Sequence, residues 1–202
     1  MTSSRLEAFS DGVLAILITI MVLELVVPHG AHLSDLWPLR FVFLSYVLSF
    51  TYLAIYWNNH HHMLYVTERV TGGVLWANMN LLFWLSMLPF VTGWMGENDF
   101  AAVPMAVYGV DLLLAAIAYY ILQTVIIRSQ GKDSLLAQAI GRDVKGKLSP
   151  ILYALAIPLA FLQPWIAFGV YAAVAIIWIV PDARIERALA AREESERAAG
   201  KR

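Results

Sequence analysis

The stretch RLEAFSDGVLAILITIMVLEL, residues 5–25, decides the fold class of this chain of 202 residues. Its second half is a nearly unbroken apolar run, and Arg5, Glu7, Ser10 and Asp11 stand at or just inside its start. An ionisable group inside a membrane span costs at least about 2.5–3.5 kcal/mol, so it normally pairs with another group or lines water. The stretch therefore predicts a membrane helix with a site of polar contacts at its N-terminal end.

The composition of the whole chain indicates an integral membrane protein. Hydrophobic residues make up 60% and charged residues 14%, whereas soluble domains are about half apolar and a quarter charged. The chain has no cysteine, which excludes disulfides, thiolate metal sites and cysteine nucleophiles. The first apolar run has no small-residue cleavage site and is expected to be retained as a span. Catalytic motifs and nucleic-acid signatures are missing from the sequence, so we expect no enzyme and no nucleic-acid partner.

Six apolar runs are of a length that fits a bilayer core, which takes about 20 helical residues. They predict one six-span domain over residues 1–181, followed by a charged cytoplasmic tail over 182–202. The predicted spans are about 8–27, 39–66, 72–95, 102–127, 148–162 and 165–180.

The positions of the basic residues predict the orientation. With a cytoplasmic N-terminus and six spans, all but one of the 14 Lys and Arg residues lie on the cytoplasmic side, and Arg40 is the exception. This asymmetry is typical of the positive-inside rule. It predicts a multi-pass protein with both termini in the cytoplasm.

The first span has two different faces. At 100° per residue, one face carries branched apolar residues and a single hydroxyl. Its members are Arg5, Gly12, Ile16, Thr19, Ile20, Leu23 and Val27. Asp11 lies on another face, together with Ile18 and Val22, and is expected to be buried against neighbouring helices.

Possible partners for Asp11 lie at the cytoplasmic ends of the next two spans. The second span ends in YWNNHHHMLY and the third begins with WANMN, and the predicted topology brings both ends to the depth of Asp11. Two interpretations stay open: a polar network around Arg5, Ser10 and Asp11, or a charge cluster that only anchors the helix at the headgroups. The candidate partners are His60, His61, His62, Asn78 and Asn80.

The start of the first span also carries a resemblance to a known family. Arg5, Phe9, Ser10 and Asp11 match the R-x-x-x-F-S-D signature of the endolysosomal potassium channel family (transmembrane protein 175) and its bacterial relatives. The isoleucine-rich helix, the number of spans and the chain length agree with that family, so the resemblance covers most of the chain.

The resemblance implies a homotetramer in the bacterial plasma membrane, with the first helix of each subunit lining a central pore and no re-entrant filter loop. It places the narrowest ring of a hydrophobic gate at Ile16, continued by Thr19, Ile20 and Leu23. Four Thr19 hydroxyls would be neutral ligands for a potassium ion in the pore, giving modest selectivity over sodium without a cofactor or bound metal. It also implies a structural network of Arg5, Phe9, Ser10, Asp11, His60, His61, His62 and Asn78.

Two other functions are weighed against a channel. One is a proton-coupled secondary transporter that uses Asp11 and the histidines at 60–62 as a relay, and the other is a structural membrane protein. Transporters typically show internal repeats and broken helices at the middle of the membrane, and the sequence shows no internal repeat.

Three further segments are interpreted as structural or peripheral. VTGWMG at 91–96 resembles a potassium filter, but it only ends the third span and is not expected to form a re-entrant loop. Asp111, inside the fourth span, is expected to pair with a tyrosine or tryptophan. Glu24 lies near the outer end of the first span, where it could attract cations.

Overall fold

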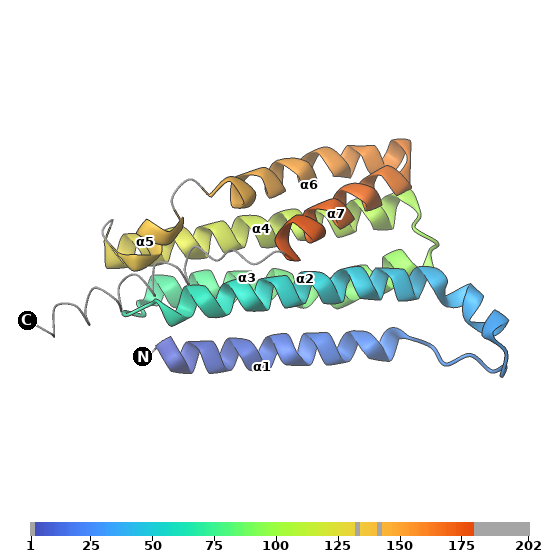
Figure 1. Ribbon diagram of the computed structural model, residues 1–202, viewed down its shortest axis with the longest axis horizontal. Coiled ribbons are helices and arrows are strands. Elements are labelled where there is room, and N and C mark those ends of the chain that lie inside the picture. Colours follow the sequence, from blue (N-terminus) through green and yellow to red (C-terminus); the bar gives the residue numbers. More distant parts are fainter. Residues whose placement is uncertain (1–2, 132–133, 141–142, 180–202) are drawn as a thin grey trace, which may run out of the picture.

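The computed structural model describes residues 3–131, 134–140 and 143–179 (Figure 1). Within these ranges every regular element is a helix and no strand occurs, which confirms the all-α fold class. The predicted tail at 182–202 lies outside the described residues. The elements are α1 (Ser3–Met21), the 3₁₀ turns η1 (Val22–Glu24) and η2 (Leu33–Leu39), α2 (Arg40–Tyr65), α3 (Gly72–Glu97), α4 (Ala102–Gln130), α5 (Leu135–Ile140), α6 (Val144–Leu162) and α7 (Pro164–Ile179).

Five of the described helical segments are long and apolar enough to cross a membrane: Ser3–Glu24, Leu33–Tyr65, Gly72–Glu97, Ala102–Gln130 and Val144–Leu162. They start or end within a few residues of the predicted spans at most boundaries. Helix α7 is also apolar but has 16 residues, which corresponds to about 24 Å of helix against a bilayer core of about 30 Å. Helix α7 (Pro164–Ile179) occupies the part of the chain where the sixth span, about 165–180, is predicted.

The first helix ends earlier than the apolar run suggests. The α-helix stops at Met21, and the chain continues through η1 into extended backbone at Leu25. Such 3₁₀ turns are common where α-helices end. Leu23 therefore lies on the 3₁₀ turn, beyond the α-helical part of the face that the sequence predicts.

The long helices form a bundle in which α1 and α6 lie along opposite edges (Figure 1). Helix α1 packs mainly against α2 and α3. Its buried residues recur every three or four positions, which is the period of one helix face. They are Leu6, Ser10, Leu14, Leu17 and Met21.

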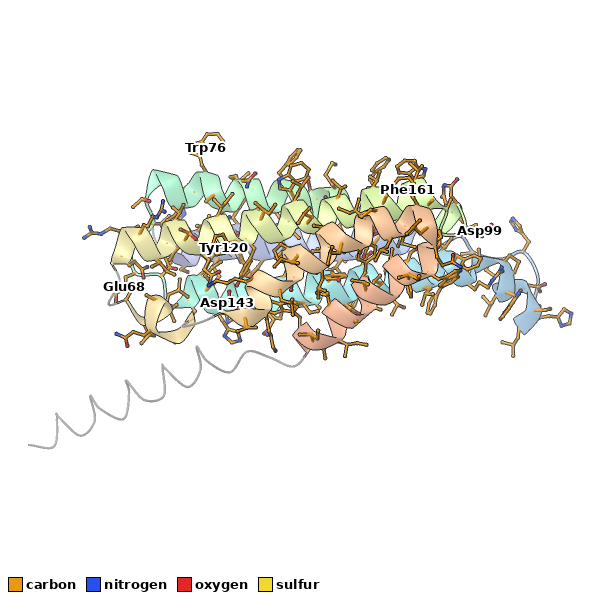
Figure 2. The ribbon with its side chains drawn as sticks, turned by 90° about the horizontal axis from the view of Figure 1, so that it is seen from above. Glu68, Trp76, Asp99, Tyr120, Asp143 and Phe161 are labelled. Atoms are coloured by element: carbon orange, nitrogen blue, oxygen red, sulfur yellow. The ribbon has the colours of Figure 1, made fainter. Side chains whose placement is uncertain are left out.

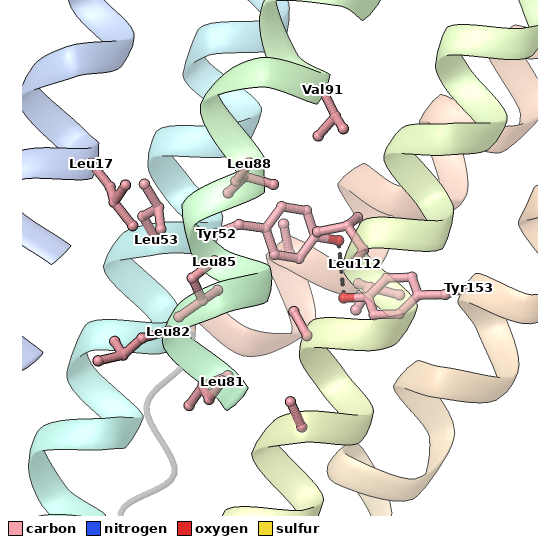
Figure 3. Packing of buried hydrophobic residues seen from close by; sticks show 14 of the residues in the cluster. Leu17, Tyr52, Leu53, Leu81, Leu82, Leu85, Leu88, Val91, Leu112 and Tyr153 are labelled. Atoms are coloured by element: carbon pink, nitrogen blue, oxygen red, sulfur yellow. Dashed lines mark hydrogen bonds between the residues drawn. The ribbon is translucent and has the colours of Figure 1, made fainter. Parts of the chain in front are cut away.

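The core between α2, α4, α6 and α7 is rich in tyrosine. The Tyr52 hydroxyl donates to the Tyr171 carbonyl at 2.7 Å and accepts from the Tyr153 hydroxyl at 3.2 Å, a contact that joins α2 to α6 in Figure 3. Apolar side chains also cover much of the outside, and Figure 2 shows Trp76 projecting away from α3. An apolar exterior over a hydrogen-bonded interior is what a lipid-embedded bundle requires.

Candidate functional site

The outer face of α1 is exposed in the single subunit. Ile16 is 57% exposed and Leu23 is 78% exposed, and Thr19 and Ile20 lie exposed between them. The opposite face of the same helix packs against α2 and α3. The helix therefore has one face in the subunit core and one face of branched apolar residues available to other molecules.

Thr19 presents its oxygen on this exposed face. Its hydroxyl lies 3.1 Å from the Ala15 carbonyl and 2.9 Å from the Ile16 carbonyl, and it donates its hydrogen to the backbone. A hydroxyl has two acceptor lone pairs beside its one hydrogen. With its hydrogen directed at the helix backbone, the Thr19 oxygen keeps lone pairs that can accept from another group.

A buried chain of hydrogen bonds joins α1 to α3 and α2. The Ser10 hydroxyl donates to the Leu6 carbonyl at 2.8 Å and accepts from Asn78 Nδ2 at 3.0 Å. Asn78 Oδ1 lies 2.6 Å from His60 Nε2, so the histidine tautomer that completes the chain carries its hydrogen on Nε2. All three side chains are buried. The chain fixes the rotation of α1 relative to both of its neighbours.

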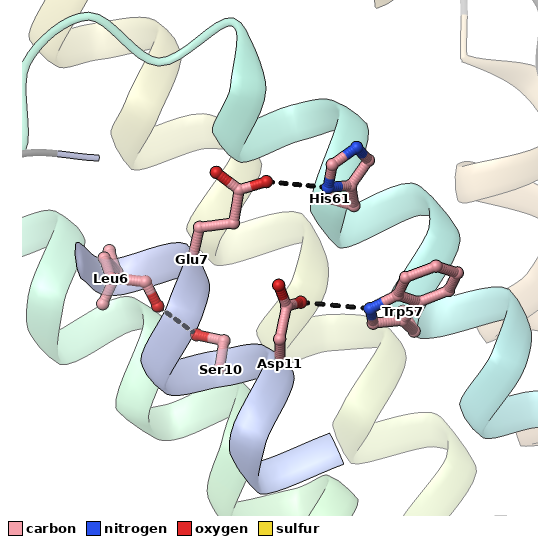
Figure 4. A network of polar contacts seen from close by, with 6 residues as sticks. All are labelled: Leu6, Glu7, Ser10, Asp11, Trp57 and His61. Atoms are coloured by element: carbon pink, nitrogen blue, oxygen red, sulfur yellow. Dashed lines mark hydrogen bonds and ion pairs between the residues drawn. The ribbon is translucent and has the colours of Figure 1, made fainter. Parts of the chain in front are cut away.

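A second pair of polar contacts joins α1 to α2 at the edge of the bundle (Figure 4). Glu7 Oε1 lies 2.7 Å from His61 Nδ1, and Trp57 Nε1 donates to Asp11 Oδ1 at 3.0 Å. The two acids are four residues apart on α1, and their partners are four residues apart on α2. Residues four apart share a helix face. Two antiparallel helices therefore bring both acids and both of their partners into contact, one pair a turn beyond the other.

The structure thus brings together Ser10, Asp11, Asn78 and two of the three histidines. Arg5 is exposed and forms no hydrogen bond or ion pair with any residue that the structure describes. Phe9 is half exposed on the same outer side. The ring of His62 meets that of His61 edge-on at a centroid distance of 5.5 Å.

Sequence reasoning missed Glu7 and Trp57. The signal that identifies them is the shared spacing of four residues, Glu7 to Asp11 on one helix and Trp57 to His61 on the other. Hydropathy alone classes a tryptophan as a packing residue, so its role as a hydrogen-bond donor to an acid appears only when the two helices are placed side by side.

The expected partner of Asp111 is not found. Its side chain is buried in α4, and both carboxylate oxygens are without a hydrogen-bond partner within the described ranges. Tyr108, one turn earlier, is hydrogen-bonded to Ser49 at 3.0 Å instead. The expectation that Asp111 pairs with a tyrosine or tryptophan is therefore wrong for this part of the chain.

Two other features of the described residues bear on function. Residues 91–96 belong to the continuous helix α3, so this segment is not a re-entrant loop. In the part of the chain that the structure covers, no three His, Asp or Glu side chains are grouped so that they could hold a metal ion.

Known proteins resemble this chain over most of its length. The sequence profile of the endosomal/lysosomal potassium channel TMEM175 matches residues 5–89. A potassium channel of Chryseobacterium sp. (strain P1-3) is 53% identical over 189 residues, which are 94% of this chain and 98% of that protein. A potassium channel of Chamaesiphon minutus is 32% identical over 192 residues, which are 86% of this chain and 92% of that protein.

The fold is also similar to a solved structure. The crystal structure of a lysosomal potassium-selective channel TMEM175 homologue from Chamaesiphon minutus has a TM-score of 0.76 to this chain, at 30% sequence identity. The similarity covers 89% of this chain and 97% of that one.

Proposed function

The chain belongs to the endosomal/lysosomal potassium channel TMEM175 family, and from this we propose that it forms a homotetrameric channel whose pore is lined by α1. It is a multi-pass membrane protein of a potassium channel family and not an enzyme. Its permeant ion is potassium, and the family uses no cofactor. A proton-coupled transporter built on Asp11 and the histidines is not favoured, because its relatives are potassium channels.

The exposed face of α1 is the observation that carries this proposal. Ile16, Thr19 and Ile20 are exposed on a helix that lies at the edge of the subunit. One copy of α1 cannot enclose a pore, whereas four copies around an axis would each turn this face inward. The buried hydrogen bonds of Ser10 and the edge contacts of Asp11 would then hold each pore helix in register without touching the ion.

The chemistry of that face supports a hydrophobic gate. A ring of four Ile16 side chains would exclude water unless it widened, which is how apolar constrictions block hydrated ions. The Thr19 ring would offer four hydroxyl oxygens close to it. Neutral oxygens favour a weakly hydrated cation, so we expect potassium to pass more readily than sodium, with modest selectivity because no charged side chain joins the ring.

We place the channel in a bacterial plasma membrane with both termini in the cytoplasm. All but one of the 14 basic residues lie on the side of the membrane that this orientation makes cytoplasmic. The relatives named above come from bacteria.

Potassium flux into proteoliposomes tests the pore assignment. The variant Ile16→Asn should wet the constriction and raise potassium flux about tenfold or more, which corresponds to a barrier lowered by about 1.4 kcal/mol. The matched control is Ile117→Asn on α4, which puts the same amide on an exposed position away from α1 and should leave flux unchanged. If Ile16→Asn tetramers assemble and carry no more potassium than the wild type, the pore assignment is wrong.

A second substitution tests the role of Thr19. Thr19→Val keeps the shape of the side chain and removes the hydroxyl, so we expect the ratio of potassium to sodium flux to fall toward one. An unchanged ratio would exclude Thr19 as the selecting ligand.

A further inference from the structure

A groove of about 320 Å³ lies where the 3₁₀ turn η1 meets the last turns of α3. This volume is at the lower end of the range of small-molecule sites, about 300–1,000 Å³. The groove is at the end of the bundle that holds the connection between α1 and α2. It is lined by Glu24, Pro89, Phe90, Gly93, Trp94 and Glu97.

The two glutamates give the groove a net negative charge. Glu24 rests against α3 at Gly93, where a Cβ atom would meet its Oε2 at 3.5 Å. Glu24 and Glu97 are exposed, and among the described residues neither forms an ion pair or a hydrogen bond. Arg40, at the start of α2, donates to the Trp37 carbonyl at 3.0 Å and stacks on the Phe41 ring at 4.1 Å, and it forms no ion pair with either glutamate.

Two aromatic rings form the adjoining wall. Phe90 and Trp94 are one turn apart on α3, and their rings are stacked with centroids 6.2 Å apart and planes at 28°. A cation within about 6 Å of such a ring is attracted by the negative charge of its face. Phe90 is exposed and Trp94 is half-buried, and accessible aromatic rings beside two carboxylates are the combination that recognises organic ammonium ions.

We propose that this groove binds an organic monocation of the quaternary ammonium class. Its methyl groups would pack on Phe90 and Trp94, and its charge would face Glu24 and Glu97. A calcium ion prefers about six to eight oxygen ligands, and the apolar walls of the groove supply none. An ammonium ion with methyl groups needs only the rings and the charge, so the lining fits it better than a metal ion.

The groove does not include Ile16, Thr19 or Ile20, the residues proposed to line the pore, and its occupancy can be measured whether or not the channel conducts. The probe is choline chloride, titrated calorimetrically into the full-length protein in maltoside micelles free of choline lipids. The matched probe is 3,3-dimethylbutan-1-ol, which has the same shape without the charge. We expect choline to bind about tenfold or more tightly than this alcohol, since one full charge faces two carboxylates and two rings.

Substitutions inside and outside the groove distinguish binding in the groove from binding to the neighbouring surface. Trp94→Leu and Glu24→Gln should each weaken choline binding about five- to tenfold, and Trp94→Phe should restore most of the affinity because it keeps a π face. Asp99→Asn and Trp37→Leu remove an acid and an exposed ring at the same end of the bundle but outside the groove, and should have no effect. Thermal melting of each variant identifies any loss that comes from misfolding.

Three results would overturn the proposal. The first is equal binding of choline and its neutral analogue, which would indicate a merely apolar groove. The second is weakening by Asp99→Asn as large as that by Glu24→Gln, which would indicate a general negative surface. The third is unchanged binding in a folded Trp94→Leu variant.

Discussion

The hydrogen-bond chain from Ser10 through Asn78 to His60 leads to a quantitative prediction about stability. Asn78 is fully buried and makes two hydrogen bonds, to Ser10 Oγ at 3.0 Å and to His60 Nε2 at 2.6 Å. Asn78→Leu removes both. Side-chain hydrogen bonds between membrane helices contribute about 0.6 kcal/mol each on average and up to about 1.7.

The larger part of the loss in stability caused by Asn78→Leu comes from His60. Its Nδ1 already lacks a hydrogen-bond partner in the described ranges, so Asn78→Leu leaves both ring nitrogens of a buried histidine unpaired. A buried polar group without a partner costs about 1–3 kcal/mol. Together with the lost hydrogen bonds, we expect Asn78→Leu to lower the free energy of unfolding by about 2–4 kcal/mol.

The assay is reversible unfolding in mixed micelles with a rising fraction of SDS, followed by circular dichroism. Asn80→Leu is the matched control, because Asn80 lies two residues further along α3 and is exposed. We expect that control to stay within about 0.5 kcal/mol of the wild type.

A double-mutant cycle measures the energetic coupling between Asn78 and His60. Replacing both hydrogen-bond partners by apolar residues can be nearly neutral, so His60→Leu combined with Asn78→Leu should cost less than the sum of the single variants by at least about 1 kcal/mol. Effects that add to within about 0.3 kcal/mol would show that the two side chains are not coupled.

Three further predictions use the same unfolding assay. Gly109→Ala should destabilise by about 1–3 kcal/mol, because a Cβ atom there would collide with the Tyr171 hydroxyl; Gly169→Ala has open space and should be neutral, and equal effects would contradict the packing. Tyr52→Phe should cost about 1–3 kcal/mol, since it removes a donor to a backbone carbonyl and the acceptor of another tyrosine; a loss below about 0.5 kcal/mol would contradict this account. Asp111→Leu should stabilise the fold by about 2–3 kcal/mol, because a buried acid without a partner is costly in a span, and any destabilisation would point to an unrecognised partner.

The polar contacts of α1 show where sequence reasoning succeeds and where it stops. The sequence indicates that the histidines and Asn78 lie at the depth of Asp11, because hydropathy and the positive-inside rule determine depth. It cannot tell which histidine turns inward. In the structure His60 faces Asn78 and His61 faces Glu7, and this assignment follows from the rotation of α2 about its own axis.

For Asp111 and Leu23, too, the sequence alone does not predict the local contacts or the end of the helix. The expectation that Asp111 pairs with an aromatic hydroxyl or indole fails because neither of its carboxylate oxygens has a hydrogen-bond partner among the described residues, and the neighbouring Tyr108 bonds to Ser49 on α2. The position of Leu23 on a 3₁₀ turn depends on where the α1 hydrogen-bond ladder ends, and a continuous apolar run does not show that point.

The sequence by itself determined that this protein is a bundle of apolar helices in a membrane, where those helices lie along the chain, and that its first helix has an apolar face with one hydroxyl. These properties are local, because hydropathy and the helical period depend on neighbouring residues. Only the tertiary structure decided which side chains meet: Trp57 with Asp11, Asn78 with Ser10, and Glu24 over Gly93. Such contacts depend on the relative rotation and shift of helices far apart in the sequence, and many packed side chains acting together set that arrangement.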